Sequence, residues 1–188
     1  RAVQRGRYRE MNKVNLILHA HLPYVRHLEY PKFLEENWLF ESLNETYIPL
    51  LRMFEKLDME GLGYHVSICF SPTLVTMLTD GPLQERFVDY MNGRIELGEK
   101  EAERTLHEDR ECHGMALRYL EEARTNLEMF ERCGRNILIG YRNLSDRNRV
   151  ELLTTAATHA YLPIYKNHPT AIKAQVVTGL RTYERVFG

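Results

Sequence analysis

Three apolar runs separated by helical stretches constrain the fold of this chain more than any other feature. The runs are KVNLILH (Lys13–His19), YHVSICF (Tyr64–Phe70) and RVELLTTAAT (Arg149–Thr158). A short continuous apolar run is typical of a strand that is covered on both faces of a parallel sheet. Strands that alternate with helices form βα units, so the pattern predicts an α/β fold with a mainly parallel sheet.

Local signals predict the helices that follow the first two runs. Apolar residues recur with helical spacing between Leu34 and Gly61. Pro49 predicts a kink or a break into two helices, and Gly61 predicts a C-terminal stop. Ser71 and Pro72 predict the cap and the first turn of the next helix.

The remaining segments and the chain length indicate part of a larger barrel. A long charged helical stretch extends from Leu83 to about Cys133, and a last helix begins near Pro169. Three strands are few for 188 residues, and a closed β/α barrel takes about 250 residues. We therefore expect residues 13–188 to be a partial barrel with a long helical insertion, and residues 1–12 to be a flexible basic leader.

Composition excludes several classes of protein. A formal net charge of −1 provides no global field for nucleic acid or anionic lipid, and no apolar run is long enough to cross a membrane. The three cysteines, Cys69, Cys112 and Cys133, form no CxxC pair, so neither a disulfide framework nor a zinc knuckle is expected. The favoured interpretation is a cytoplasmic protein with reduced thiols.

Polar residues at the ends of the predicted strands suggest a site. His19 and His21 end the first strand, and side chains at i and i+2 of a strand point to the same side. Glu151 lies in the third apolar run, and His159 lies where that strand is expected to end. Because barrel sites form at the C-terminal ends of strands, we expect these four residues to gather at one mouth of the barrel.

The residue types at this mouth leave two chemistries open. Neutral imidazoles bind metal ions, and they also donate hydrogen bonds to sugar hydroxyls. Tyr24 and Trp38 follow the first strand and could stack on sugar faces, although packing against a helix is the favoured interpretation for Trp38.

Five segments carry a resemblance to a known family. They are HAHLPYVRH, EENWLFESLNETYIPLL, SPTLVTML, ELGEKE and VELLTTAATHAYLPIY, in matching order along almost the whole chain. They resemble the N-terminal part of the α-1,4-glucan branching enzymes of glycoside hydrolase family 57. The resemblance implies the N-terminal portion of a distorted (β/α)7 barrel that acts on α-1,4-glucans with retention of configuration, without a metal or other cofactor.

The resemblance also implies roles for residues of the predicted site. His21 matches a histidine that holds the sugar, Glu151 matches a glutamate beside the same subsite, and Thr158-His159 matches the TH pair of branching enzymes. His19, Tyr24 and Trp38 complete the expected substrate-binding set.

No acidic residue of the chain matches the catalytic nucleophile or the acid/base of the family, which we expect beyond Gly188. The 188 residues alone are therefore expected to be inactive, and the C-terminal part of the same enzyme is their expected partner.

Two alternatives come from other classes of function. In a metal-dependent hydrolase, His19, His21 and His159 would bind zinc, since an HxH pair at the first strand is also typical of amidohydrolase-type barrels. In a non-catalytic glucan-binding module, the chain would bind glucan without turnover.

Overall fold

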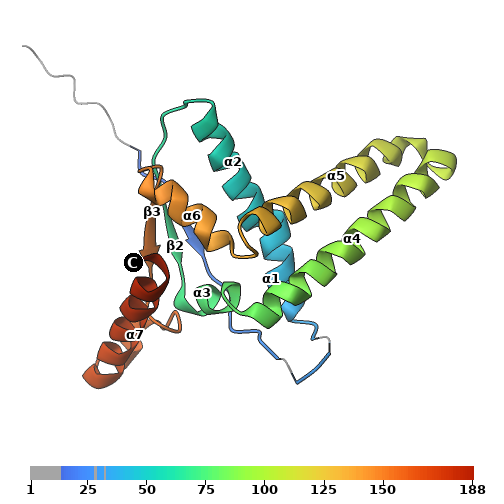
Figure 1. Ribbon diagram of the computed structural model, residues 1–188. Coiled ribbons are helices and arrows are strands. Elements are labelled where there is room, and N and C mark those ends of the chain that lie inside the picture. Colours follow the sequence, from blue (N-terminus) through green and yellow to red (C-terminus); the bar gives the residue numbers. More distant parts are fainter. Residues whose placement is uncertain (1–13, 28, 32) are drawn as a thin grey trace, which may run out of the picture.

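A three-stranded parallel sheet forms the centre of the structure. The computed structural model describes residues 14–27, 29–31 and 33–188. Its strands are β1 (Ile17–Ala20), β2 (Val66–Phe70) and β3 (Val150–Thr154), and β2 lies between the other two (Figure 1). The predicted parallel α/β sheet is confirmed, with strands shorter than the apolar runs. The predicted leader, residues 1–12, lies outside the described residues.

Helices cover only one face of this sheet. The covered face carries buried apolar side chains from all three strands: Ala20, Val66, Ile68, Phe70, Val150 and Leu152. The other face, called the open face below, consists of the alternate positions: Ile17, His19, Ser67, Cys69, Glu151 and Leu153.

On the open face Ile17 is 57% exposed, so the prediction that the first strand is covered on both faces is wrong. In the central strand β2, by contrast, all five residues are buried.

The segment after β1 folds as a broken helix, as predicted. It consists of α1 (Glu36–Ser42), a π-helical turn (Leu43–Tyr47) and α2 (Ile48–Met59). Pro49 lies in the first turn of α2, and because the helical backbone is continuous from Glu36 to Met59, its missing N–H group interrupts the hydrogen bonds where the π-helical turn joins α2. Gly61 has a φ of 71° and ends the helical segment, as predicted.

The helices around β2 and β3 are α3 (Pro72–Leu78), α6 (Ile137–Asp146) and α7 (Pro169–Phe187), with a 3₁₀ turn at Leu162–Tyr165. The predicted cap is confirmed, because the Ser71 side chain accepts a hydrogen bond from Leu74 N–H. Helix α6, where no helix was expected, packs against α2 and β3.

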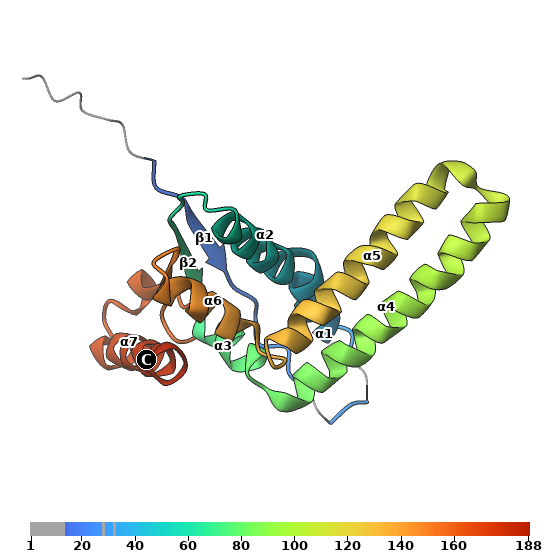
Figure 2. The same ribbon diagram turned by 45° about the horizontal axis from the view of Figure 1, so that its top comes forward.

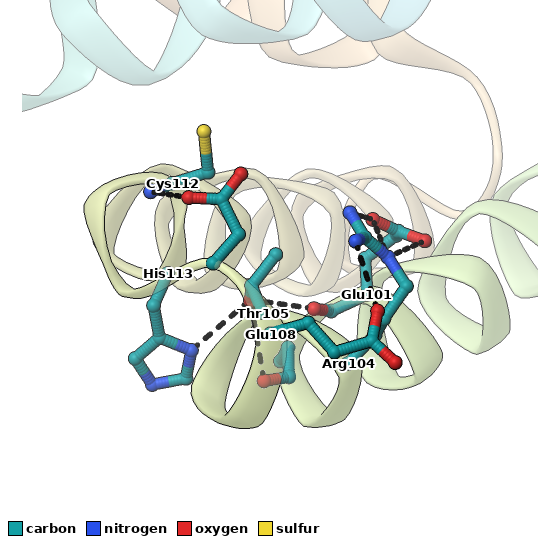
Figure 3. A network of polar contacts seen from close by, with 8 residues as sticks. Glu101, Arg104, Thr105, Glu108, Cys112 and His113 are labelled. Atoms are coloured by element: carbon teal, nitrogen blue, oxygen red, sulfur yellow. Dashed lines mark hydrogen bonds and ion pairs between the residues drawn. The ribbon is translucent and has the colours of Figure 1, made fainter.

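The predicted helical insertion is a long antiparallel hairpin of α4 (Gly81–Glu108) and α5 (Arg110–Arg132), which projects away from the sheet (Figures 1 and 2). Asp109 separates the two helices and caps α5 by accepting a hydrogen bond from Cys112 N–H. At this turn Thr105 Oγ1 donates to the Glu101 carbonyl and contacts His113 Nδ1 at 3.2 Å (Figure 3).

Within the part of the chain that the structure describes, no helix is both long and apolar enough to cross a membrane. The charges on α4 and α5 form ion pairs along the helix surfaces instead, as the sequence indicated.

Candidate functional site

Three histidines meet where β1 ends. His19 Nε2 lies 2.8 Å from His159 Nε2, and the rings of His21 and His159 stack with their centroids 4.0 Å apart. The ring centroids of His19 and His21 are 6.3 Å apart. These three residues, called the histidine cluster below, confirm that β1 and the loop after β3 bring His19, His21 and His159 together.

Different elements hold the rings of the cluster. His21 Nδ1 lies 2.8 Å from the hydroxyl of Ser71, the fully buried residue that caps α3. His159 has a left-handed backbone, with φ of 55°, and ends a tight turn in which its N–H donates to the Ala156 carbonyl. The orientation of each ring therefore depends on structure outside its own residue.

The protonation of the cluster is constrained by its geometry. A hydrogen bond between His19 Nε2 and His159 Nε2 needs one donor and one acceptor, so at least one of these rings is neutral. Burial lowers the pKa of His21, and the neighbouring His159 and His19 lower it further. Neutral imidazoles both donate and accept hydrogen bonds, which suits the hydroxyl groups of a sugar.

Glu151 does not lie at the mouth of the sheet, so this part of the prediction is wrong. It is the second residue of β3 and pairs in register with Ser67, whereas His19 lies in the next row of the open face. Two residues along a strand span about 6.6 Å, so Glu151 lies deeper on the same face. Its Oε2 accepts a 2.6 Å hydrogen bond from the Ser67 hydroxyl.

Cys69 lies beside His19 in the sheet register but is not an activated nucleophile. Burial raises the pKa of its thiol, which therefore stays protonated at neutral pH. The other two cysteines, Cys112 and Cys133, are also free.

The two predicted aromatic residues lie apart from the cluster. Tyr24 lies in the loop after β1 and is 52% exposed, whereas Trp38 is in α1 and is 50% exposed. Trp38 therefore lies in the segment for which helical spacing was expected, and its half-exposed side chain remains open to either interpretation. Within the described part of the chain, no ring contact joins either residue to the histidines.

The donor groups of the cluster are engaged with one another. Among residues 14–27, 29–31 and 33–188, no three His, Cys, Asp or Glu side chains are arranged to hold a metal ion. His19 and His159 direct their Nε2 atoms at each other, and Nδ1 of His21 is directed at Ser71. The geometry thus fits hydrogen bonding better than the zinc site of the metal-dependent alternative.

A separate groove of about 820 Å³ lies between α4, α5 and the start of α2. Its lining includes Glu101, Arg104, Thr105 and Cys112 of the turn region in Figure 3, but none of the predicted site residues. The groove is therefore not part of the predicted sugar site.

Two serines of the site were missed as site residues. Ser67 interrupts the apolar run of β2, and this polar residue in a buried strand is a signal that the sequence offered. Ser71 was identified only as a helix cap, and nothing local in the sequence indicates its second contact, with His21.

Comparison with known proteins places this geometry in a family. The family model described as glycosyl hydrolase family 57 matches residues 15–188. The chain belongs to glycosyl hydrolase family 57. This confirms the resemblance found in the five sequence segments.

Several relatives within family 57 are known. The chain is 35% identical over 176 residues to a 1,4-alpha-glucan branching enzyme of Thermococcus kodakarensis, covering 93% of this chain and 25% of that protein. Among solved structures, the alpha-amylase AmyC from Thermotoga maritima is 41% identical with a TM-score of 0.89, over 93% of this chain and 33% of that one. The GH57-type branching enzyme from Pyrococcus horikoshii is 34% identical with a TM-score of 0.84, over 93% and 32%.

The chain thus spans a quarter to a third of the length of these family 57 relatives. Its parallel sheet and helices match the N-terminal portion of the barrel in the solved structures. The expected fold class, the N-terminal portion of an α/β barrel with a long helical insertion, is therefore confirmed.

Proposed function

We propose that this chain forms the N-terminal part of the substrate site of an α-1,4-glucan branching enzyme. The enzyme would cleave an α-1,4 linkage with retention of configuration and transfer the released chain to a 6-hydroxyl of another glucan. The histidine cluster at the carboxyl end of β1, in a family 57 fold, is the observation that carries this proposal. Two relatives named as branching enzymes, at 34–35% identity, support transfer as the reaction.

The cluster would hold the sugar through its imidazole groups. His21 is fixed by Ser71 and His159 by its turn, so both rings are oriented before substrate arrives. Preoriented polar groups stabilise charge that develops on the sugar without a further reorganisation cost. Glu151, held by Ser67, would contact the substrate deeper on the open face. Tyr24 and Trp38 remain proposed stacking residues because their side chains are half exposed.

We propose that both catalytic carboxylates come from residues outside this chain. A retaining mechanism needs two carboxyl groups about 5–5.5 Å apart. Among the six positions of the open face, Glu151 is the one carboxylate. The 188 residues would therefore bind glucan without turnover, and the rest of the complete protein would supply the catalytic pair.

Hydrolysis is the second candidate reaction, because the alpha-amylase AmyC is 41% identical to this chain with a TM-score of 0.89. The two reactions differ only in whether a glucan hydroxyl or water resolves the covalent glycosyl intermediate. Nothing in the histidine cluster distinguishes a glucan hydroxyl from water as the acceptor. The two reactions must therefore be distinguished by their products.

The test uses the native protein expressed from its complete gene and incubated with amylose. Branching produces the anomeric proton signal of α-1,6 linkages in NMR spectra without a matching increase in reducing ends. An increase in reducing ends without α-1,6 linkages would instead establish the amylase reaction. Absence of both products, together with no glucan binding, would reject both candidates.

Substitution of a cluster residue links the activity to the site. His21→Ala is expected to lower kcat/KM at least about tenfold, because a preoriented polar contact to the sugar is lost. The matched control is His168→Ala, since His168 is an exposed histidine whose side chain makes no capping hydrogen bond to α7. Equal effects of the two substitutions would contradict the proposed role of the cluster.

We further propose a cytoplasmic enzyme of glycogen biosynthesis, whose polymer substrate is an α-1,4-glucan. The free cysteines support a reducing compartment, since none of the three pairs with another. Cell fractionation followed by detection of the protein in the soluble fraction tests this location.

A further inference from the structure

The backbone of His159 is unusual and needs support from elsewhere. A φ of 55° at a residue with a side chain is uncommon and costs free energy relative to the right-handed region. The turn from Ala156 to His159 has one internal hydrogen bond, from His159 N–H to the Ala156 carbonyl. The position of the His159 ring over His21 depends on this turn, so the contacts that hold the turn matter for the site.

One residue of α7, Gln175, makes three hydrogen bonds to this turn. Its backbone carbonyl accepts from Ala157 N–H at 3.0 Å, and its side-chain Oε1 accepts from Thr158 N–H at 3.0 Å. Its Nε2 donates to the Thr158 hydroxyl at 2.9 Å. Because a backbone N–H can only donate, the oxygen of the Gln175 amide must face Thr158 N, which sets the orientation of the whole amide group.

A second contact of α7 lies one helical turn further on. Gly179 is buried, and a Cβ atom at this position would overlap the carbonyl oxygen of Thr155. Gln175 and Gly179 are four residues apart and so share one face of α7. This face contacts the residues that connect the end of β3 to His159 at two places.

We propose that Gln175 is a positioning residue, which fixes the Ala156–His159 turn from α7 and thereby holds the His159 ring against His19 and His21. Among the described residues, the hydrogen bonds of Gln175 to this turn go to Ala157 and Thr158 and not to a histidine ring, so Gln175 acts through these two residues. Its effect on sugar binding rests on the proposed function, whereas its effect on the position of the His159 ring does not. Gln175→Met removes the two side-chain bonds to Thr158 and keeps the backbone bond from Ala157 N–H. Without the two side-chain bonds the turn relaxes from its left-handed end, and His159 leaves the cluster.

The first test measures ring positions without any sugar. In the native protein labelled with ¹³C-histidine, NMR titration follows the rings of wild type and Gln175→Met. His159 is one of the groups that lower the pKa of His21, together with burial and His19. Loss of the His159 contact is therefore expected to raise the pKa of His21 toward its ordinary value and to shift the resonances of His159. An unchanged pKa of His21 together with unchanged His159 resonances in a folded variant would overturn the proposal.

The second test measures binding of maltoheptaose by calorimetry. Gln175→Met is expected to weaken binding about tenfold, in keeping with loss of one well-placed group. In a His159→Ala background the same substitution is expected to have no further effect, since Gln175 acts through His159. Additive losses would show that Gln175 does not act through this ring, and would overturn the proposal.

Two further variants separate positioning from general damage. Thr158→Val removes only the hydroxyl that accepts from Gln175 Nε2, so it gives a smaller change in the same direction even where Gln175→Met fails to fold. Lys173→Met changes an exposed residue of the same helix and is expected to leave the titration and the affinity at wild-type values. If wild type does not bind maltoheptaose, the proposed function fails, while the sugar-free titration still decides the role of Gln175.

Discussion

The Nε2 atoms of His19 and His159 lie 2.8 Å apart although the two residues are 140 positions apart in the chain. This hydrogen bond joins β1 directly to the loop after β3, across the strand that separates them in the sheet. One proton occupies the space between the two rings, and a second would replace attraction by repulsion. The cluster is therefore assembled most completely when its histidines are not all charged.

Acid is expected to destabilise the folded chain through this cluster. The pKa of His21 in the folded state lies below its ordinary value of 6.5, first because of burial and then because of His159 and His19. Between these two pKa values the unfolded state binds more protons than the folded state. The free energy of unfolding therefore decreases as the pH is lowered. The contribution of neutral His21 to the free energy of unfolding is complete above pH 6.5. It is lost as the pH falls through the pKa of His21 in the folded state. Urea unfolding at a series of pH values measures this decline.

The control for acid destabilisation is His159→Gln, which removes one of the groups that lower the pKa of His21. This variant is expected to show a shallower decline of the unfolding free energy below pH 6.5. A decline identical to wild type would mean that other groups cause the acid sensitivity.

Loss of one partner of a buried ion pair outside the site is expected to destabilise the fold. Glu36 is 2% exposed and accepts a hydrogen bond from Arg86, whose side chain is 22% exposed. Arg86→Met leaves a buried carboxylate without its partner, which costs about 3 kcal/mol. The exposed pair Lys100–Glu96 is the matched control, and Lys100→Met is expected to cost less than about 0.5 kcal/mol. Equal losses in denaturant unfolding would contradict this difference.

The local part of the fold and site could be predicted from the sequence because its causes are local. The period of a strand places His19 on the open face, His21 follows directly after the strand, and the Ser71-Pro72 pair starts a helix. Pro49 and Gly61 likewise act within their own turns.

The non-local part could not be predicted, because it depends on register and on which elements cover each face. Glu151 lies below the mouth since its row is set by pairing with Ser67, and no residue near Glu151 determines that register. The apolar run of β1 gave no sign that helices cover only one face, where Ile17 remains exposed. The contact between Gln175 and the turn before His159 spans an entire loop, and a glutamine within a helix carries no local signal of it.

Replacement of two helical glycines by alanine is expected to change the stability of the fold in opposite directions. A Cβ at Gly140 of α6 would lie 2.5 Å from Cδ2 of the fully buried Leu51 and 3.3 Å from Cys133 Sγ, so the Leu51 side chain would have to shift within the core. Gly140→Ala is therefore expected to destabilise the fold by about 1–3 kcal/mol. Gly93 of α4 has open space around its Cβ position, so Gly93→Ala is expected to stabilise by about 0.5–1 kcal/mol. Thermal unfolding of both variants gives the comparison, and a loss at Gly93 would contradict it.

Removal of the Ser71 hydroxyl is expected to lower the free energy of unfolding by more than the loss of a helix cap alone. Its hydroxyl accepts from Leu74 N–H and also contacts His21 Nδ1 at 2.8 Å, in a fully buried position. Asn136 caps α6 by accepting from Leu138 N–H and is the matched control for capping alone. Asn136→Ala is expected to cost about 1 kcal/mol, and Ser71→Ala about 2 kcal/mol, because the half-buried His21 Nδ1 also loses its 2.8 Å contact. Urea unfolding measures both losses. If Ser71→Ala costs no more than Asn136→Ala, the serine does not hold His21, and the preorientation that we assign to this ring must come from stacking on His159.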